Sequence, residues 1–122
     1  MILVDTSVWV DHFRSGDSEL SDLLNAGQAL IHPFVIGELA CGNLKNRAAV
    51  LSLLHNLPFA TIAEDPEALC FIERHQLCGV GIGFIDVHLL ASTRLSGGAL
   101  LWTRDKRLHQ QAVRLTLAKV SV

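Results

Sequence analysis

The chain has few charged residues and no excess of positive charge. Only 18% of its 122 residues are Asp, Glu, Lys or Arg, and the formal net charge is −2. Domains that bind nucleic acids through a global electrostatic footprint are basic, so any phosphate contact here must come from a local group of side chains. Half of the residues are hydrophobic. This composition argues against disorder and predicts a single domain over residues 1–122.

Cysteine is scarce, and long hydrophobic runs are missing. Cys41, Cys70 and Cys78 are odd in number and lack the C-x-x-C spacing of a zinc or redox site. We therefore expect reduced thiols in a cytoplasmic protein. No apolar run approaches the ~20 residues of a membrane span. The first apolar run follows no basic segment and Asp5 interrupts it, so we expect neither a signal peptide nor contact with a membrane.

Short apolar segments alternate with stretches of helical pattern. The apolar segments predict strands over residues 1–4, 29–32, 59–62, 99–103 and 115–120. Helix-start residues, glycine stops and apolar spacing predict one helix directly after Asp5 and others over residues 18–26, 33–40, 43–56, 65–78, 84–95 and 105–113. This alternation is typical of the α/β class with a mainly parallel sheet.

Four acidic residues lie in unusual sequence surroundings. Asp5 directly follows the first predicted strand, and Asp105 follows the one that ends at Thr103. Glu38 and Asp86 have apolar neighbours on both sides. The carboxyl ends of parallel strands share one edge of a sheet, so Asp5 and Asp105 can converge there, and Glu38 and Asp86 can join them. Taken singly, Asp5 and Asp105 also suit helix caps, and Asp86 suits the first turn of a helix.

Four converging carboxylates would need a compensating charge. Two like charges ~4 Å apart cost ~4 kcal/mol at an effective dielectric near 20, so the cluster must hold protons or bind a cation. Oxygen ligands without histidine or thiolate favour Mg²⁺ or Mn²⁺. Neighbouring hydroxyls could orient the acids, and basic residues beside Asp105 could hold phosphate groups or simply be solvated. These are Thr6, Ser7 and Thr103, and Arg104, Lys106 and Arg107.

Four segments of the chain together resemble a known family. Each segment carries one of the four acids, and they follow in order over essentially the whole chain. They resemble the four acidic motifs of PIN-domain ribonucleases, above all those of VapC-type toxins from bacterial toxin–antitoxin pairs. The segments are Asp5–Asp11, Val35–Leu39, Ile82–Ser92 and Leu101–Leu108.

The resemblance implies a PIN-like three-layer α/β/α fold and a Mg²⁺- or Mn²⁺-dependent endoribonuclease. RNA, such as a tRNA or an rRNA, would be hydrolysed by a metal-activated water. It also implies a small VapB-like antitoxin that neutralises the enzyme, operator DNA bound only through that antitoxin, and a homodimer. Metal binding and catalysis would fall to four acids, with three hydroxyls in support: Asp5, Glu38, Asp86 and Asp105, and Thr6, Ser7 and Thr103.

One position departs from the family pattern. Many relatives carry a further acid two residues after the last one, where this chain has Arg107. Because this removes a carboxylate ligand, we expect one firmly held cation and a second that arrives with the RNA.

Three other functions compete with this interpretation. A phosphate-receiver domain needs an acid near the middle of the chain, and residues 44–61 contain none. A haloacid-dehalogenase-like phosphatase needs D-x-D-x-T, and Asp5-Thr6-Ser7 lacks the second acid. A non-catalytic PIN-like module that binds RNA or protein remains the alternative, since ligands alone do not establish activity.

Overall fold

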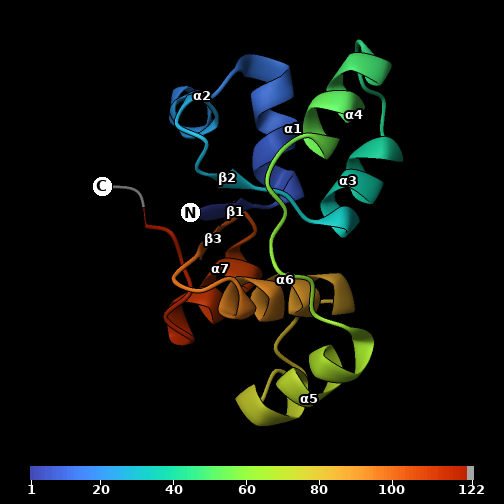
Figure 1. The fold of residues 1–122 in the computed structure, drawn as a ribbon. Coiled ribbons are helices and arrows are strands. Elements are labelled where there is room, and N and C mark those ends of the chain that lie inside the picture. The colour runs from blue at the N-terminus through green and yellow to red at the C-terminus, as the bar shows by residue number, and fades with distance from the viewer. Residues whose placement is uncertain (121–122) are drawn as a thin grey trace.

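In the computed structural model, which describes residues 1–120, three parallel strands form the central sheet (Figure 1). Their order is β2-β1-β3, and both neighbours of β1 run parallel to it. Single parallel bridges extend the sheet at Phe59 beside β2 and at Ala118 beside β3. The strands are β1 (Ile2–Val4), β2 (Ala29–Leu30) and β3 (Leu100–Trp102).

The helices cover both faces of the sheet. In Figure 1, α1 to α4 lie above it, α6 and α7 lie below it, and α5 packs on the far side of α6. The result is the three-layer α/β/α arrangement. The helices are α1 (Thr6–Ser15), α2 (Ser18–Asn25), α3 (Pro33–Ala40), α4 (Arg47–His55), α5 (Asp65–His75), α6 (Phe84–Leu95) and α7 (Lys106–Arg114).

The core lies on both sides of β1. Leu3 and Val4 are fully buried, because one face of the strand meets α1 and the other meets α6. A continuous apolar run is the pattern expected of a strand covered on both faces. Trp9 on α1 is also fully buried and stacks on Phe13 at a ring-centroid distance of 5.6 Å. Within residues 1–120, no helix combines the length and hydropathy needed to cross a bilayer.

The strands predicted over residues 59–62 and 115–120 are reduced to single bridges in the structure. The chain leaves the sheet after Phe59 because side chains of α6 replace the sheet as acceptors. The N–H of Thr61 donates to Ser96 Oγ at 2.9 Å, and the N–H of Ala63 donates to Ser92 Oγ at 3.1 Å. The segment predicted over residues 115–120 pairs only around Leu101, beside Ala118.

The helix predicted over residues 43–56 begins four residues later, at Arg47. Asn46 before it adopts a left-handed conformation with φ of 53°, which an α-helix does not contain. The apolar spacing of Leu44 and Ala48 suggested a longer helix. Leu44 instead lies in the turn that joins α3 to α4.

Candidate metal centre

Asp5 joins the end of β1 to the start of α1, and only 7% of its surface is exposed. It occupies the N-cap position, but its side chain makes no capping bond. Its Oδ2 instead accepts hydrogen bonds from Ser7 Oγ and from Thr103 Oγ1, each at 2.8 Å. The backbone N–H of Asp5 donates to Trp102 O at 2.9 Å. Asp5 is therefore fixed by the end of β3 rather than used as a helix cap.

Thr103 connects Asp5 with Asp105. While its hydroxyl donates to Asp5, it accepts from the N–H of Asp105 at 3.1 Å. Asp105 Oδ1 in turn accepts from the N–H of Leu108 at 2.9 Å and caps α7. Ser7 Oγ, which also bonds Asp5, accepts from the N–H of Arg104 at 3.0 Å. Two hydroxyls thus hold the ends of β1 and β3 in register, so that the acids after them lie at one sheet edge.

Glu38 and Asp86 approach this edge from two helices. Glu38 lies on α3, and its Oε1 accepts from Thr6 Oγ1 at 2.7 Å, which joins α3 to the start of α1. Asp86 lies in the first turn of α6, where its Oδ2 accepts from the N–H of Gly83 at 3.3 Å. An acid in the first turn also interacts favourably with the helix dipole.

The four carboxylates share one arrangement. In each, the protein binds one oxygen by the hydrogen bonds just described, and the second oxygen accepts none from residues 1–120. The first bond fixes the orientation of the carboxylate and leaves the second oxygen for a ligand. The unbonded oxygens are Asp5 Oδ1, Glu38 Oε2, Asp86 Oδ1 and Asp105 Oδ2.

The charges of the four acids act on one another. Burial raises the pKa of Asp86 above its usual value, and the negative charges of Asp5, Asp105 and Glu38 raise it further. The N–H of Gly83 offsets part of this shift. The structure thus brings the four acids that the sequence singled out close enough for their charges to act on Asp86.

A divalent cation fits this set of donors. All four side chains offer carboxylate oxygen, the ligand that Mg²⁺ and Mn²⁺ prefer, and a cation would offset the repulsion that raises the pKa of Asp86. Within residues 1–120, no three acidic, histidine or cysteine side chains already surround a single point as a finished metal site would. Binding of an ion would therefore have to draw these carboxylates closer together.

Of the three basic residues beside Asp105, only Arg104 forms ion pairs within residues 1–120. Arg104 is already occupied, because its Nη1 binds Asp11 Oδ2 at 2.9 Å and its Nη2 binds Asp17 Oδ2. Lys106 and Arg107 are exposed and form no ion pair within residues 1–120. The bridge from Arg104 to α1 and to the N-cap of α2 could not be predicted from the sequence, because its partners lie about ninety residues earlier in the chain.

Arg107 also has a packing role. Its side chain lies against Gly81, where an added Cβ would come within 2.8 Å of Arg107 Cδ. Gly81 has a φ of +86°, a conformation that favours glycine. The Gly-rich segment before α6 is therefore shaped to accommodate Arg107.

A groove runs from this site between α1, α3 and α4. Its volume is about 710 Å³, and Thr6 and Glu38 belong to both the site and the groove. Apolar and basic side chains line it, together with the polar residues Thr6, Glu38, Asn43 and Asn46. The apolar and basic residues are Val10, Leu39, Leu44 and Val50, and Arg14 and Lys45. This groove could not be predicted from the sequence, because its lining comes from three separate helices and from the turn between α3 and α4.

Comparisons with known proteins agree with this geometry. The PIN domain family model matches residues 2–114, a span that contains all four acids. Proteins named Ribonuclease VapC32 from two Mycobacterium tuberculosis strains, CDC 1551 / Oshkosh and ATCC 25618 / H37Rv, are each 51% identical to this chain over 108 residues. Each match covers 88% of this chain and 87% of the relative.

Proposed function

Because this chain belongs to the PIN-domain family, we propose that it is the endoribonuclease toxin of a toxin–antitoxin pair and hydrolyses RNA phosphodiesters with the help of Mg²⁺ or Mn²⁺. The observation that carries the proposal is the group of four carboxylates, each held through one oxygen and open at the other. The relatives named Ribonuclease VapC32 support the RNA substrate and the toxin role.

Four acids would bind the cation: Asp5, Glu38, Asp86 and Asp105. A bound divalent cation lowers the pKa of a water molecule and stabilises charge on a phosphoryl group. Ser7 and Thr103 fix Asp5, and Thr6 fixes Glu38, so these hydroxyls set the positions of the donors. Since Arg107 stands where many relatives have a further acid, we propose one firmly held cation and a second that arrives with RNA.

Substrate phosphates would be bound by Lys106 and Arg107, which flank Asp105 and have free charges within the described residues. Arg104 would contribute only if a phosphate displaced Asp11 or Asp17, so we assign it mainly to holding α1, α2 and the site together.

The groove beside Glu38 is the proposed binding site of a VapB-like antitoxin. Its apolar lining residues, with Arg14 and Lys45 beside them, would suit an amphipathic acidic segment, and a ligand there would cover Thr6 and Glu38. Such a ligand would block substrate access to the acids and so neutralise the enzyme. We propose that operator DNA is bound only through this antitoxin, and that the complex acts in the cytoplasm, where its RNA substrate is found.

A homodimer is part of the proposal. Phe34 and Phe84 pack edge-on against the buried ring of His88 at 4.9 Å and 4.7 Å, yet 37% and 42% of their surfaces are exposed. Exposed aromatic side chains of this kind are typical of protein interfaces. Phe34→Glu is expected to shift the protein from dimer to monomer in sedimentation equilibrium, and an unchanged dimer would place the interface elsewhere.

The alternative function is a PIN-like module that binds RNA or protein without cleaving it. A pure binding module has no need of four acids that raise the pKa of one of their own members, and we therefore favour the enzyme.

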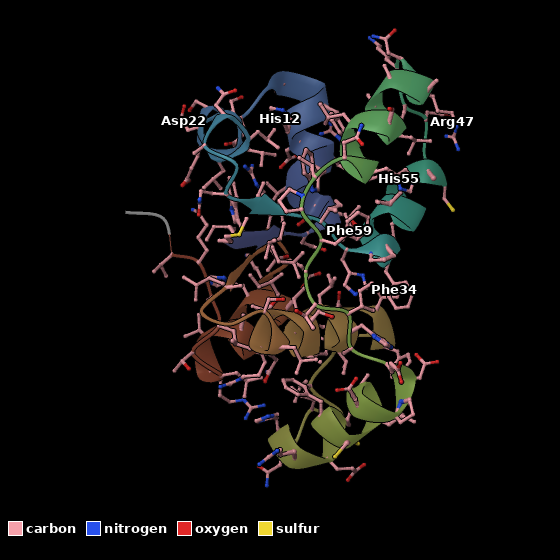
Figure 2. The ribbon with its side chains drawn as sticks, in the orientation of Figure 1. His12, Asp22, Phe34, Arg47, His55 and Phe59 are labelled. Atoms are coloured by element: carbon pink, nitrogen blue, oxygen red, sulfur yellow. The ribbon has the colours of Figure 1, made fainter. Side chains whose placement is uncertain are left out.

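Cleavage of cellular RNA tests the proposal. The purified, antitoxin-free protein is incubated with total RNA and Mg²⁺ or Mn²⁺, with and without EDTA. Discrete fragments are expected with the wild type and with Asp22→Asn, a control at an exposed acid on α2 (Figure 2). They are expected to disappear with EDTA and with Asp5→Asn. A folded, metal-loaded wild type that leaves the RNA intact would support the binding module.

A further inference from the structure

A second pocket lies between α5 and α6, outside the acidic site. Its volume is about 680 Å³, within the range of small-molecule and nucleotide sites. The buried side chains of Phe71 and Ala91 form an apolar floor. The rim carries the basic residues Arg74, His75 and Arg94, together with the acid Glu67 and the exposed Leu95.

Three arginines gather around His75 at this rim. Burial lowers the pKa of His75, and the positive charges of Arg94, Arg74 and Arg114 lower it further. Arg114 Nη2 donates to His75 O at 2.6 Å, so α7 also contributes a charge to the rim. Three of the ten basic residues of an acidic chain therefore occupy one small region.

No carboxylate neutralises these arginines within residues 1–120. Arg94 Nη2 donates to Leu115 O at 2.9 Å, and Arg114 Nε donates to Gln111 Oε1 at 2.9 Å. These acceptors are neutral, so they fix the guanidinium groups without cancelling their charge. Glu67 is an acid among the lining residues; its Oε1 accepts from the N–H of Glu64 at the start of α5, and it forms no ion pair with these arginines within residues 1–120.

We propose that this pocket binds a phosphate group of the RNA strand, together with part of the adjoining base, at a distance from the bond that is cut. Guanidinium groups match phosphate geometry, and the apolar floor offers contact area for a base. The inference rests on the proposed function, because it extends the same RNA beyond the acidic site.

The spacing along α6 suits one RNA strand. Arg94 follows Asp86 by eight residues on this helix, which corresponds to ~12 Å along the axis. Successive phosphates of a duplex strand are about 3.4 Å apart along its axis. A strand stacked with this duplex-like rise and with its cut bond near Asp86 would thus bring phosphates three to four nucleotides away to the level of Arg94.

Binding of RNA tests this site without cleavage. Fluorescence anisotropy is measured with a short labelled single-stranded RNA in EDTA, over a series of salt concentrations, for the wild type, Arg74→Gln and the double variant Arg74→Gln/Arg94→Gln. The matched control is Arg47→Gln, which removes one charge from α4 at the opposite end of the molecule from α5 (Figure 2). The side chain of Arg74 makes no hydrogen bond within residues 1–120, so its replacement should leave the thermal midpoint unchanged.

We expect the double variant to bind RNA on the order of tenfold more weakly. Its slope of log affinity against log salt should fall by about 0.7, because one phosphate contact of a single strand contributes about 0.7. Arg74→Gln should show about half of this change in slope, and Arg47→Gln none. Unchanged affinity and slope in Arg74→Gln would overturn the inference, and so would an equal loss in Arg47→Gln.

Two further measurements test whether the pocket binds a free nucleotide or a second copy of the chain instead of RNA. If adenosine monophosphate binds in an Arg74-dependent way while RNA affinity does not depend on Arg74, the pocket serves a free nucleotide and the RNA proposal is wrong. It is also wrong if Arg74→Gln changes the oligomeric state, since the pocket then lies between copies. Failure of the proposed function is seen separately, as a wild type that binds RNA but does not cleave it with Mn²⁺.

Discussion

Thr103 is the residue on which the geometry of two carboxylates depends. Its hydroxyl donates to Asp5 and accepts from the N–H of Asp105. We expect Thr103→Val, which has nearly the same shape, to reduce RNA cleavage or metal affinity by about 10–100-fold, as losing such an orienting contact does in other metal sites. The free energy of unfolding should fall by only about 1–2 kcal/mol. Initial rates and urea unfolding measure the two effects.

Thr61→Val is the matched control for this experiment, because Thr61 is exposed and its hydroxyl makes no hydrogen bond within residues 1–120. Full activity in Thr103→Val would show that Ser7 alone suffices to hold Asp5.

His32 should make the stability of the protein depend on pH. It is fully buried, and burial, together with the charge of His88, lowers its pKa to about 4. Below the usual value of 6.5 the unfolded chain binds a proton that the native state does not, so the free energy of unfolding falls as the pH drops from 6.5 to 4. The loss should reach about 3 kcal/mol.

Replacement of His32 by Asn tests this prediction. Asn retains an acceptor for the N–H of Phe34, which His32 Nδ1 binds at 3.0 Å, but it does not titrate. Urea unfolding between pH 4 and pH 7 should show a flatter pH dependence in His32→Asn than in the wild type. His55→Asn, at an exposed histidine of α4 (Figure 2), should behave as the wild type. Parallel curves for His32→Asn and wild type would contradict the prediction.

At the start of α7, Asp105 both caps the helix and belongs to the candidate metal centre. Asp105 caps the helix with Oδ1 and leaves Oδ2 for a ligand. We expect both Asp105→Asn and Asp105→Ala to lose RNA cleavage, because neither keeps the charge. Only Asp105→Ala should lose about 1 kcal/mol of stability, since Asn is also a good N-cap. Equal thermal midpoints for the two variants, or activity in Asp105→Asn, would contradict this division.

At the scale of elements, the sequence predicted best where the signals are local. The helix predicted over residues 84–95 has those bounds in the structure, and so has the one over 33–40, where Pro33 starts the helix. The strand over residues 59–62 was predicted from its apolar pattern. It fails because Ser96, the C-cap residue of α6, accepts from the N–H of Thr61, and Ser92 on α6 accepts from the N–H of Ala63 just beyond the segment. Hydrogen bonds between segments far apart in the chain cannot be recognised from the local sequence.

At the scale of the whole molecule, the parallel sheet made the convergence of Asp5 and Asp105 predictable. Both follow strands, and neighbouring parallel strands end at one edge. The bonds from Thr6 to Glu38 and from Arg104 to Asp17 were not predictable, because each joins residues far apart in the sequence. The basic pocket between α5 and α6 was not predictable either, because its arginines are separated along the chain and the net charge does not show where basic residues gather.

The most direct test of the account is the number and affinity of Mn²⁺ ions that the protein binds, measured from the loss of the free-ion signal in electron paramagnetic resonance. The account predicts one firmly bound ion per wild-type chain, and at least about tenfold weaker binding in Asp5→Asn and Asp86→Asn. Asp22→Asn should bind as the wild type does. If Asp5→Asn and Asp86→Asn bind Mn²⁺ as tightly as the wild type, these carboxylates do not form a metal centre and the account is contradicted.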